Sequence, residues 1–232
     1  RLMESYARGC ALGIVKLHNS SDIKAVLMHD YESFNPDLIC ALAGVVGEDN
    51  VLMVEPMKLH TTFKIGGPAD LLVKPQDPQQ LVRVLDTCTF AETPVTVVGN
   101  GSDLLVSDRG IRGVVVLLRE NMADVRIEGT RVIAQAGALL RDVALAAADA
   151  GLSGLEPLWG IPATVGGACF MNAGAYGGQT SDVLESVDVY VPSKRGQRGS
   201  VCTLDVDQLN MGYRKSRVNT DGLIVLSATF KL

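Results

Sequence analysis

Residues 160–178 read GIPATVGGACFMNAGAYGG and are the most distinctive stretch of the chain. Eight glycines fall in the 28 residues from Gly151 to Gly178, too many for a regular element, because glycine destabilises the interior of a helix or strand. Apolar residues lie between them, which is unlike a solvated linker. The pattern favours a backbone laid along an extended ligand, with N–H and C=O groups contacting it directly. The alternative is a packed loop, or glycines that let two elements touch.

A second glycine-rich stretch, GNGSDLL at residues 99–105, directly follows the β-branched run 95–98, which predicts a strand. Glycines can adopt positive φ and let successive N–H groups converge on an anion, and the side chains of Asn100 and Ser102 add donors. This favours a phosphate-cradling loop, and a simple strand-to-loop turn is the alternative. The stretch is neither a Walker loop nor a dinucleotide fingerprint, because the required lysine and third glycine are missing.

A third stretch, MGYRKSR at residues 211–217, places Tyr213 and Arg214 beside a glycine. Arginine is permanently charged, and its planar fork fits a carboxylate or a phosphate. The pair is therefore a candidate anion clamp. Basic runs of this kind are also common on solvated surfaces, so that alternative stays open.

Local patterns predict two helices and several strands, which is an α+β fold. Asp77-Pro78 is typical of a helix start, and the apolar residues of 81–88 fall on one face. An Ala-rich helix at 139–147 is expected to end at Gly151. The predicted strands are residues 71–73, 95–98, 114–118, 125–127, 132–134, 187–191, 201–204 and 223–230, with a hairpin turn at 128–130. Residues 1–40 carry no motif, and Asn35-Pro36 is interpreted as a polar break.

Composition and charge narrow the class of protein. The 232 residues are 47% apolar, 20% charged and 5% aromatic, which is typical of a globular protein and unlike a disordered one. The 21 basic and 26 acidic residues leave no basic excess for nucleic-acid binding. No apolar run approaches the roughly 20 residues of a spanning helix, so we expect no membrane segment.

Cysteine and histidine usage argues against disulfides and metals. The five cysteines are widely spaced, with no Cys-x-x-Cys pair, which favours reduced thiols and a cytoplasmic location. They are Cys10, Cys40, Cys88, Cys169 and Cys202. The three histidines, His18, His29 and His60, are not spaced as metal ligands. We therefore expect no metal site.

Taken in order, residues 60–70, 98–105, 160–178 and 212–216 resemble the UDP-N-acetylenolpyruvoylglucosamine reductase (UDP-N-acetylmuramate dehydrogenase) family, flavoenzymes of bacterial peptidoglycan biosynthesis. The resemblance implies an FAD-binding fold of the vanillyl-alcohol-oxidase or PCMH type, made of two α+β subdomains. These would be residues 41–118 and 119–232, with residues 1–40 unassigned. The family's third, substrate-binding domain is expected to be missing from this chain.

The resemblance also implies site residues and co-substrates. FAD would be bound non-covalently, since no histidine lies between Val98 and Gly178 to attach it. The implied FAD contacts are Gly99, Asn100, Gly101, Ser102, Asp103, Leu104, Ile161, Pro162, Thr164, Val165, Gly166, Gly167, Ala168, Asn172, Ala173, Gly174 and Ala175. Arg214 and Tyr213 would serve catalysis and Tyr176 the substrate mouth. NADPH would supply hydride for a nucleotide-sugar substrate, and no obligate protein partner is implied.

The family's proton donor, a Ser or Cys, and its late Glu have no counterpart that can be assigned in this chain. The implied expectation is a chain that binds FAD but completes the reduction poorly, because it lacks a general acid. Two alternatives remain: a non-catalytic FAD-binding fragment, and another FAD-dependent small-molecule oxidoreductase of the same fold.

Overall fold

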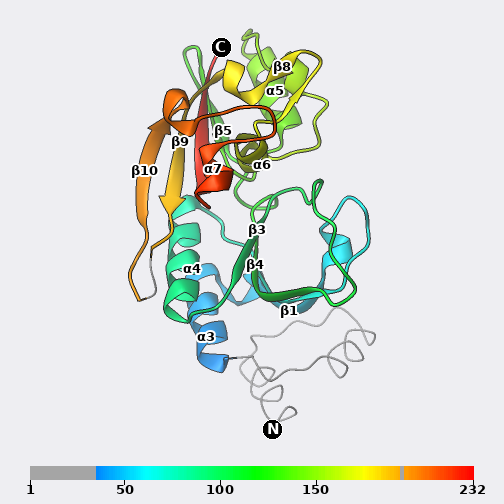
Figure 1. Ribbon diagram of the computed structural model, residues 1–232, viewed down its shortest axis with the longest axis vertical. Helices are drawn as coiled ribbons and strands as arrows, with labels where there is room; N and C mark the ends of the chain where they lie inside the picture. The colour runs from blue at the N-terminus through cyan, green and yellow to red at the C-terminus, as the bar shows by residue number, and fades with distance from the viewer. Residues whose placement is uncertain (1–34, 194–195) are drawn as a thin grey trace. The chain divides into compact units, whose positions relative to one another are not determined.

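The computed structural model describes residues 35–193 and 196–232 (Figure 1). Residues 1–34, most of the segment without a predicted motif, lie outside this description. The described residues form two compact units. The first holds residues 35–98, 103–117 and 196–197, and the second holds residues 99–102, 118–193 and 198–232. Each unit has its own sheet, and each is described by itself.

The first unit is built on a four-stranded sheet of order β1-β2-β4-β3. Strand β1 pairs antiparallel with β2, whereas β2 and β3 both pair parallel with β4. The bounds are β1 Val51–Pro56, β2 Pro68–Val73, β3 Val95–Val98 and β4 Ile111–Leu117. Helix α4 (Pro78–Phe90) connects β2 to β3, the two strands that lie on either side of β4.

Helix α4 confirms the start signal and the apolar face expected from sequence. The Asp77 side chain accepts a hydrogen bond from the Gln80 N–H at 2.7 Å, which caps the first turn, and Pro78 follows it. The buried face consists of Leu81, Val84, Leu85 and Cys88. Burial in this apolar setting raises the pKa of the Cys88 thiol to about 12.

Helix α3 (Pro36–Val46) begins inside residues 1–40, where no element was expected. The Asn35 side chain accepts a hydrogen bond from the Asp37 N–H at 3.0 Å, and Pro36 occupies the first turn. Asn35-Pro36 is therefore a helix start, and its interpretation as a polar break is wrong. Buried Leu38, Leu42 and Val46 lie on one side of the helix, which packs against α4.

The second unit is built on a five-stranded antiparallel sheet of order β10-β9-β11-β6-β5. Figure 1 shows β9 and β10 side by side as a long hairpin. The bounds are β5 Val125–Glu128, β6 Arg131–Gln135, β9 Leu184–Val191, β10 Ser200–Asp205 and β11 Ile224–Lys231. Every strand predicted from sequence is present in one of the two sheets.

Three helices and a small hairpin complete the second unit. Helix α5 (Leu140–Asp149) packs on β5 and β6, and Gly151 after it has a φ of 73°, as expected of a helix stop. Helix α6 (Val165–Met171) packs on β11 and β6, and α7 (Arg217–Thr220) packs on α6. The hairpin joins β7 (Gly174–Ala175) to β8 (Gly178–Gln179).

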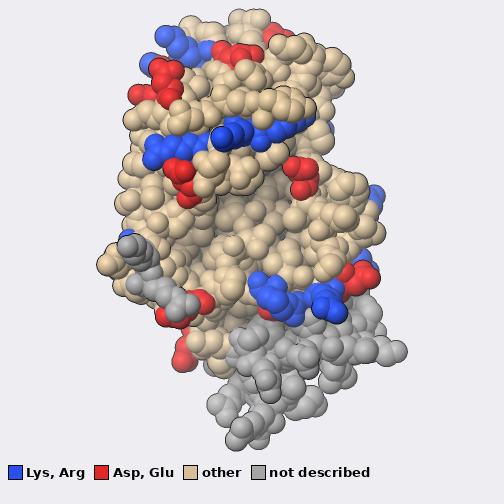
Figure 2. Space-filling view, in the orientation of Figure 1, with Lys and Arg blue, Asp and Glu red and all other residues tan. Residues whose placement is uncertain are grey.

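The face drawn in Figure 2 carries charges of both signs, and some of its Lys and Arg side chains form a continuous band. On the face drawn in Figure 2, Lys and Arg side chains lie near Asp and Glu on a surface that is otherwise uncharged. This distribution accords with the small formal net charge of −5.

Candidate functional site

The 99–102 loop packs against the chain just before α6, so two segments singled out separately from sequence lie together in the second unit. The Asn100 Nδ2 donates to the Pro162 carbonyl at 2.7 Å. A Cβ added at Gly99 would lie 2.2 Å from the Thr164 Oγ1, far inside contact distance. Glycine at this position is what allows the loop to approach Thr164.

The 99–102 loop keeps polar groups available for a ligand. Among the described residues, neither the Asn100 N–H nor the Ser102 N–H donates a backbone hydrogen bond. The Asn100 Oδ1 is buried without a partner there, and Gly101 holds a positive φ of 61°. Unpaired N–H groups beside a positive-φ glycine are the elements of an anion nest. These residues fit the pyrophosphate of a dinucleotide.

Helix α6 corrects the expectation that residues 160–178 are too glycine-rich for a regular element. Thr164 is its N-cap, with the side-chain oxygen accepting from the Gly167 N–H at 3.4 Å. Gly166 lies in the first turn, and a Cβ there would lie 3.2 Å from Ala136. The glycine lets the helix lie close to that segment, so packing outweighs the low helix propensity of glycine.

The start of α6 has little donor capacity left for an anion. The N–H groups of Val165 and Gly166 donate to the carbonyls of Ala138 and Ala136, both at 2.8 Å. The Ala163 N–H donates to the Ile161 carbonyl. Ile161, Pro162, Gly166 and Gly167 keep accessible surface that could line a cofactor, whereas Thr164, Val165 and Ala168 are buried. The unpaired backbone donors lie in the 99–102 loop.

The segment after α6 is held tightly by its own hydrogen bonds. Asn172 ends the helix in the left-handed conformation, with a φ of 44°. The carbonyl of Ala173 accepts from both the N–H and the hydroxyl of Thr180. Gly174 and Ala175 pair with Gln179 and Gly178 in the small hairpin. Tyr176, at the tip of that hairpin, is 92% exposed.

Tyr213 and Arg214 form the tip of a tight turn, which we name the arginine turn (residues 212–215). Gly212 and Lys215 exchange two backbone hydrogen bonds of 2.9 and 3.1 Å. Arg214 has a φ of 52° and forms no ion pair with any other described residue. Its guanidinium lies 5.7 Å from the ring centroid of the exposed Tyr213. The turn thus presents an exposed, permanently charged side chain to solvent.

Other expected residues lie in the first unit. Leu104 packs against its apolar core, and Asp103 is exposed. Asp70, within the 60–70 stretch, is 7% exposed; it accepts from the Gly113 N–H and pairs with Arg112, both at 2.9 Å. His60 lies 2.8 Å from the buried Glu55 carboxylate. These polar side chains of the stretch hold the unit together.

Ser216 lies within the 212–216 stretch, but the sequence analysis gave it no role. It is fully buried, donates its hydroxyl to the Phe170 carbonyl at 2.7 Å and caps α7. The signal was a serine directly before a short helical segment, a common N-cap pattern.

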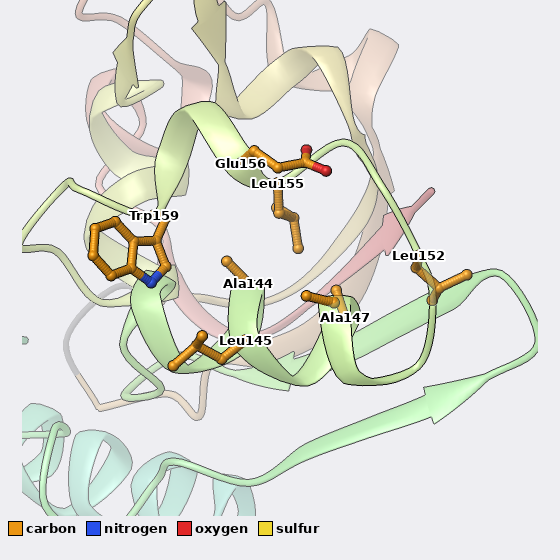
Figure 3. Close-up of a pocket in the computed structure, with 8 residues that line it drawn as sticks. Ala144, Leu145, Ala147, Leu152, Leu155, Glu156 and Trp159 are labelled. Atoms are coloured by element: carbon orange, nitrogen blue, oxygen red, sulfur yellow. The ribbon is translucent and has the colours of Figure 1, made fainter.

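A separate groove of about 280 Å³ lies between α5 and the 3-10 turn Glu156–Leu158 (Figure 3). It is lined by Ala144, Leu145, Ala147, Ala148, Leu152, Leu155, Glu156 and Trp159, none of which is an expected cofactor contact. The Glu156 carboxyl accepts hydrogen bonds from the backbone N–H of Glu156, from Ser153 and from Gly154, and these bonds lower its pKa. That carboxylate is therefore already engaged in the local turn.

Two negative findings concern the described residues only. Within residues 35–193 and 196–232, no group of His, Cys, Asp and Glu side chains is arranged to hold a metal ion. No helix in that part of the chain is both long and apolar enough to cross a membrane.

The two α+β units, together with the glycine loops of the second, define an FAD-binding fold of the PCMH or vanillyl-alcohol-oxidase type. The family described as FAD binding domain matches residues 69–196, more than half of the chain. The chain belongs to this family. The α+β fold class expected from sequence is confirmed.

The amino-acid sequence is similar to reductases of one kind. It is 45% identical over 205 residues to UDP-N-acetylenolpyruvoylglucosamine reductase of Clostridium botulinum, covering 88% of this chain and 64% of that protein. The chain therefore spans slightly less than two thirds of the curated relatives' length. The resemblance inferred from the motifs is confirmed at the level of sequence similarity.

Comparison with solved structures supports the same family and fold. UDP-N-acetylenolpyruvylglucosamine reductase from Thermus caldophilus aligns with a TM-score of 0.63 and 39% identity, over 76% of this chain and 60% of that one. An alkyldihydroxyacetonephosphate synthase aligns with a TM-score of 0.62 over 87% of this chain and 41% of its own. At 18% identity the second likeness concerns the fold alone.

Proposed function

We propose that the chain binds FAD non-covalently and serves the NADPH-linked reduction of UDP-N-acetylglucosamine enolpyruvate to UDP-N-acetylmuramate in peptidoglycan biosynthesis. The observation that carries the proposal is that the 99–102 loop, α6 and the arginine turn all belong to the second unit. The similarity to enzymes named for this reaction supports it.

The proposed cofactor contacts divide into two kinds. The backbone N–H groups of Asn100 and Ser102 would hold the pyrophosphate, since they remain unpaired among the described residues. Residues 161–168 and 173–175 would line the remaining cofactor surface. Asp103 and Leu104 stay proposed contacts as the continuation of the loop. When bound, FAD supplies hydride transfer from NADPH to the enol-ether double bond.

Arg214 is proposed to stabilise charge on the substrate. Hydride addition to the enolpyruvyl group builds negative charge on the carbon beside the carboxylate. A fixed cation there lowers the barrier more than it favours the ground state. The guanidinium fork can hold the carboxylate through two parallel hydrogen bonds. Tyr213 would orient the substrate or the nicotinamide, and Tyr176 would lie at the substrate mouth.

Compartment and partners complete the proposal. We place the protein in the cytoplasm, supported by the free thiols of the described cysteines, Cys40, Cys88, Cys169 and Cys202. The proposed partners are small molecules, a nucleotide sugar and NADPH, with no nucleic acid, membrane or obligate protein.

The absorption spectrum of the purified protein, before and after incubation with FAD and removal of excess ligand, tests cofactor binding. We expect a flavin band close to one FAD per chain. A colourless protein that takes up no FAD would overturn the proposal. Oxidation of NADPH that depends on UDP-N-acetylglucosamine enolpyruvate then separates an enzyme from the second candidate, a non-catalytic FAD binder, which would stay yellow without consuming NADPH.

A further inference from the structure

Asn172, expected from sequence to contact the cofactor, is a residue only 3% exposed, and its side-chain amide makes three hydrogen bonds within the protein. Its Oδ1 accepts from the Ser181 N–H at 3.0 Å. Its Nδ2 donates to the Gly212 carbonyl at 3.1 Å and to the Gln179 Oε1 at 3.2 Å. An asparagine has two side-chain donor hydrogens and one acceptor oxygen. The Asn172 amide thus uses both donors and its acceptor oxygen on two other segments, one around residues 179–181 and the other at Gly212.

The bond to Gly212 fixes one end of the arginine turn. The Gly212 carbonyl also accepts from the Lys215 N–H at 3.1 Å, so both of its lone pairs are used. The other end is fixed by the buried Ser216, whose hydroxyl donates to the Phe170 carbonyl at 2.7 Å. The last turn of α6 and its cap therefore hold the arginine turn on both sides, and only Tyr213, Arg214 and Lys215 remain exposed.

We propose that Asn172 is a positioning residue: its side-chain amide fixes the arginine turn to the end of α6, so that Arg214 meets the substrate carboxylate in a preset orientation. The orientation of Arg214 matters only if the proposed function is right, whereas the attachment of the turn does not depend on it. A preoriented cation stabilises developing charge without reorganisation during the reaction. Asparagine suits this position because it tolerates the left-handed backbone that ends α6.

The variant Asn172→Gly tests the side chain of Asn172 separately from its backbone conformation. Glycine adopts a φ of 44° readily, so the variant removes the hydrogen bonds without adding backbone strain. Asn172→Asp is the second variant: it keeps an acceptor for the Ser181 N–H but loses both donations. If one variant fails to fold, the other still lacks the donation to the Gly212 carbonyl.

The first measurement is amide hydrogen exchange at Gly212 and Lys215, whose N–H groups bond across the arginine turn. We expect exchange about tenfold faster in both variants, the factor that corresponds to about 1.4 kcal/mol, with amides of β9 changed less than twofold. Unchanged exchange at the turn would overturn the proposal. Equal acceleration in β9 would also overturn it, because that result means general destabilisation. This measurement needs no FAD, so it decides the attachment even if the protein binds none.

The second measurement is the FAD content and substrate affinity of the loaded protein, with UDP-N-acetylglucosamine enolpyruvate titrated against the flavin spectrum. We expect unchanged FAD content and about fivefold weaker substrate binding in Asn172→Gly. In an Arg214→Ala background the same change should alter binding less than twofold, since the effect acts through the arginine. Equal weakening in both backgrounds, or loss of FAD from Asn172→Gly, would contradict a positioning role.

Discussion

Arg214 adopts a backbone conformation that non-glycine residues usually avoid. Its φ of 52° lies in the left-handed region, which costs an L-residue about 1–2 kcal/mol. Asn172 and Tyr176, the latter at the tip of the β7–β8 hairpin, share this conformation. Strain of this kind persists where surrounding contacts fix the backbone, and it is often found at functional sites. At the arginine turn those contacts are the bonds to α6.

Replacing Arg214 by alanine tests its proposed role. We expect Arg214→Ala to retain FAD and to lose substrate-dependent NADPH oxidation by about 100-fold or more, as when one charge-stabilising group is removed elsewhere. Steady-state kinetics and the flavin spectrum measure the two properties. Arg214→Gly is the matched control: it should lose the same activity, yet it relieves the backbone strain. Loss of flavin from either variant would show that the role is wrong.

Gly99 offers a steric test of the 99–102 loop. In Gly99→Ala the new methyl group would lie 2.2 Å from the Thr164 Oγ1, so the loop must move. We expect about 1–3 kcal/mol lower unfolding free energy, as for other overpacked sites, and weaker FAD binding. Urea unfolding and FAD titration measure the two effects.

Gly44→Ala is the matched control for this change. Gly44 lies in α3 with nothing within 4 Å of the added methyl group. The control should be stabilised by about 1 kcal/mol through helix propensity. A Gly99→Ala variant as stable as wild type would contradict the close packing of the loop.

At the level of elements, sequence patterns predicted what depends on local signals. Helix α4 follows from its cap and its apolar period, and the β5–β6 hairpin from two short apolar runs around a glycine. Helix α6 could not be predicted, because Gly166 is helical only through its packing on Ala136, a contact between segments distant in sequence. Helix α3 was missed although Asn35-Pro36 carried a usable start signal.

The cap of α4 can be tested directly. We expect Asp77→Ala to lower the unfolding free energy by about 1 kcal/mol, since the Gln80 N–H would lose its acceptor. Chemical denaturation measures the change. Asp77→Asn keeps a side-chain acceptor and should remain within a few tenths of a kcal/mol of wild type. If the alanine and asparagine variants were equally stable, the cap would contribute nothing.

The ion pair between Arg131 on β6 and Glu185 on β9 makes the folding stability depend on pH. The Arg131 Nη2 donates a hydrogen bond to the Glu185 Oε1 at 2.8 Å. This hydrogen bond lowers the pKa of the Glu185 carboxyl below its ordinary 4.5. A lowered folded-state pKa stabilises the protein above the unfolded-state value, and this contribution is lost as pH falls through the folded-state value.

Glu185→Gln should therefore be less stable than wild type at pH 7, with the difference shrinking below about pH 4. Urea unfolding of both proteins at pH 7 and pH 3 measures it. Glu120→Gln serves as a control for removing an exposed carboxylate. A difference between Glu185→Gln and wild type that is the same at both pH values would contradict the linkage.

At the scale of the whole molecule, each unit carries its own sheet and buried core. Most of the proposed FAD contacts, residues 99–102 and 161–175, belong to the second unit. Sequence motifs placed these candidates on the chain but gave no sign of which N–H groups were already bonded. That distinction depends on the carbonyls of Ala136 and Ala138, which no motif identified.

FAD should stabilise the folded chain through mass action. At an FAD concentration 100 times the dissociation constant, we expect about 2.7 kcal/mol of added stability and a higher melting temperature. Thermal unfolding across an FAD series measures it, with riboflavin, which lacks the pyrophosphate, as the matched ligand. An equal shift with riboflavin would mean that the 99–102 loop contributes nothing to binding.

Among the described residues, each unit holds one buried cysteine thiol that can report when the unit opens. Burial raises the pKa of Cys88 in α4 and of Cys169 in α6 to about 12, and only a thiolate reacts readily with an alkylating reagent. Each of these two thiols is therefore expected to react with the reagent only after its own helix has opened. Because one lies in each unit, the order in which they become labelled during slow denaturation reports which unit opens first, without any engineered probe.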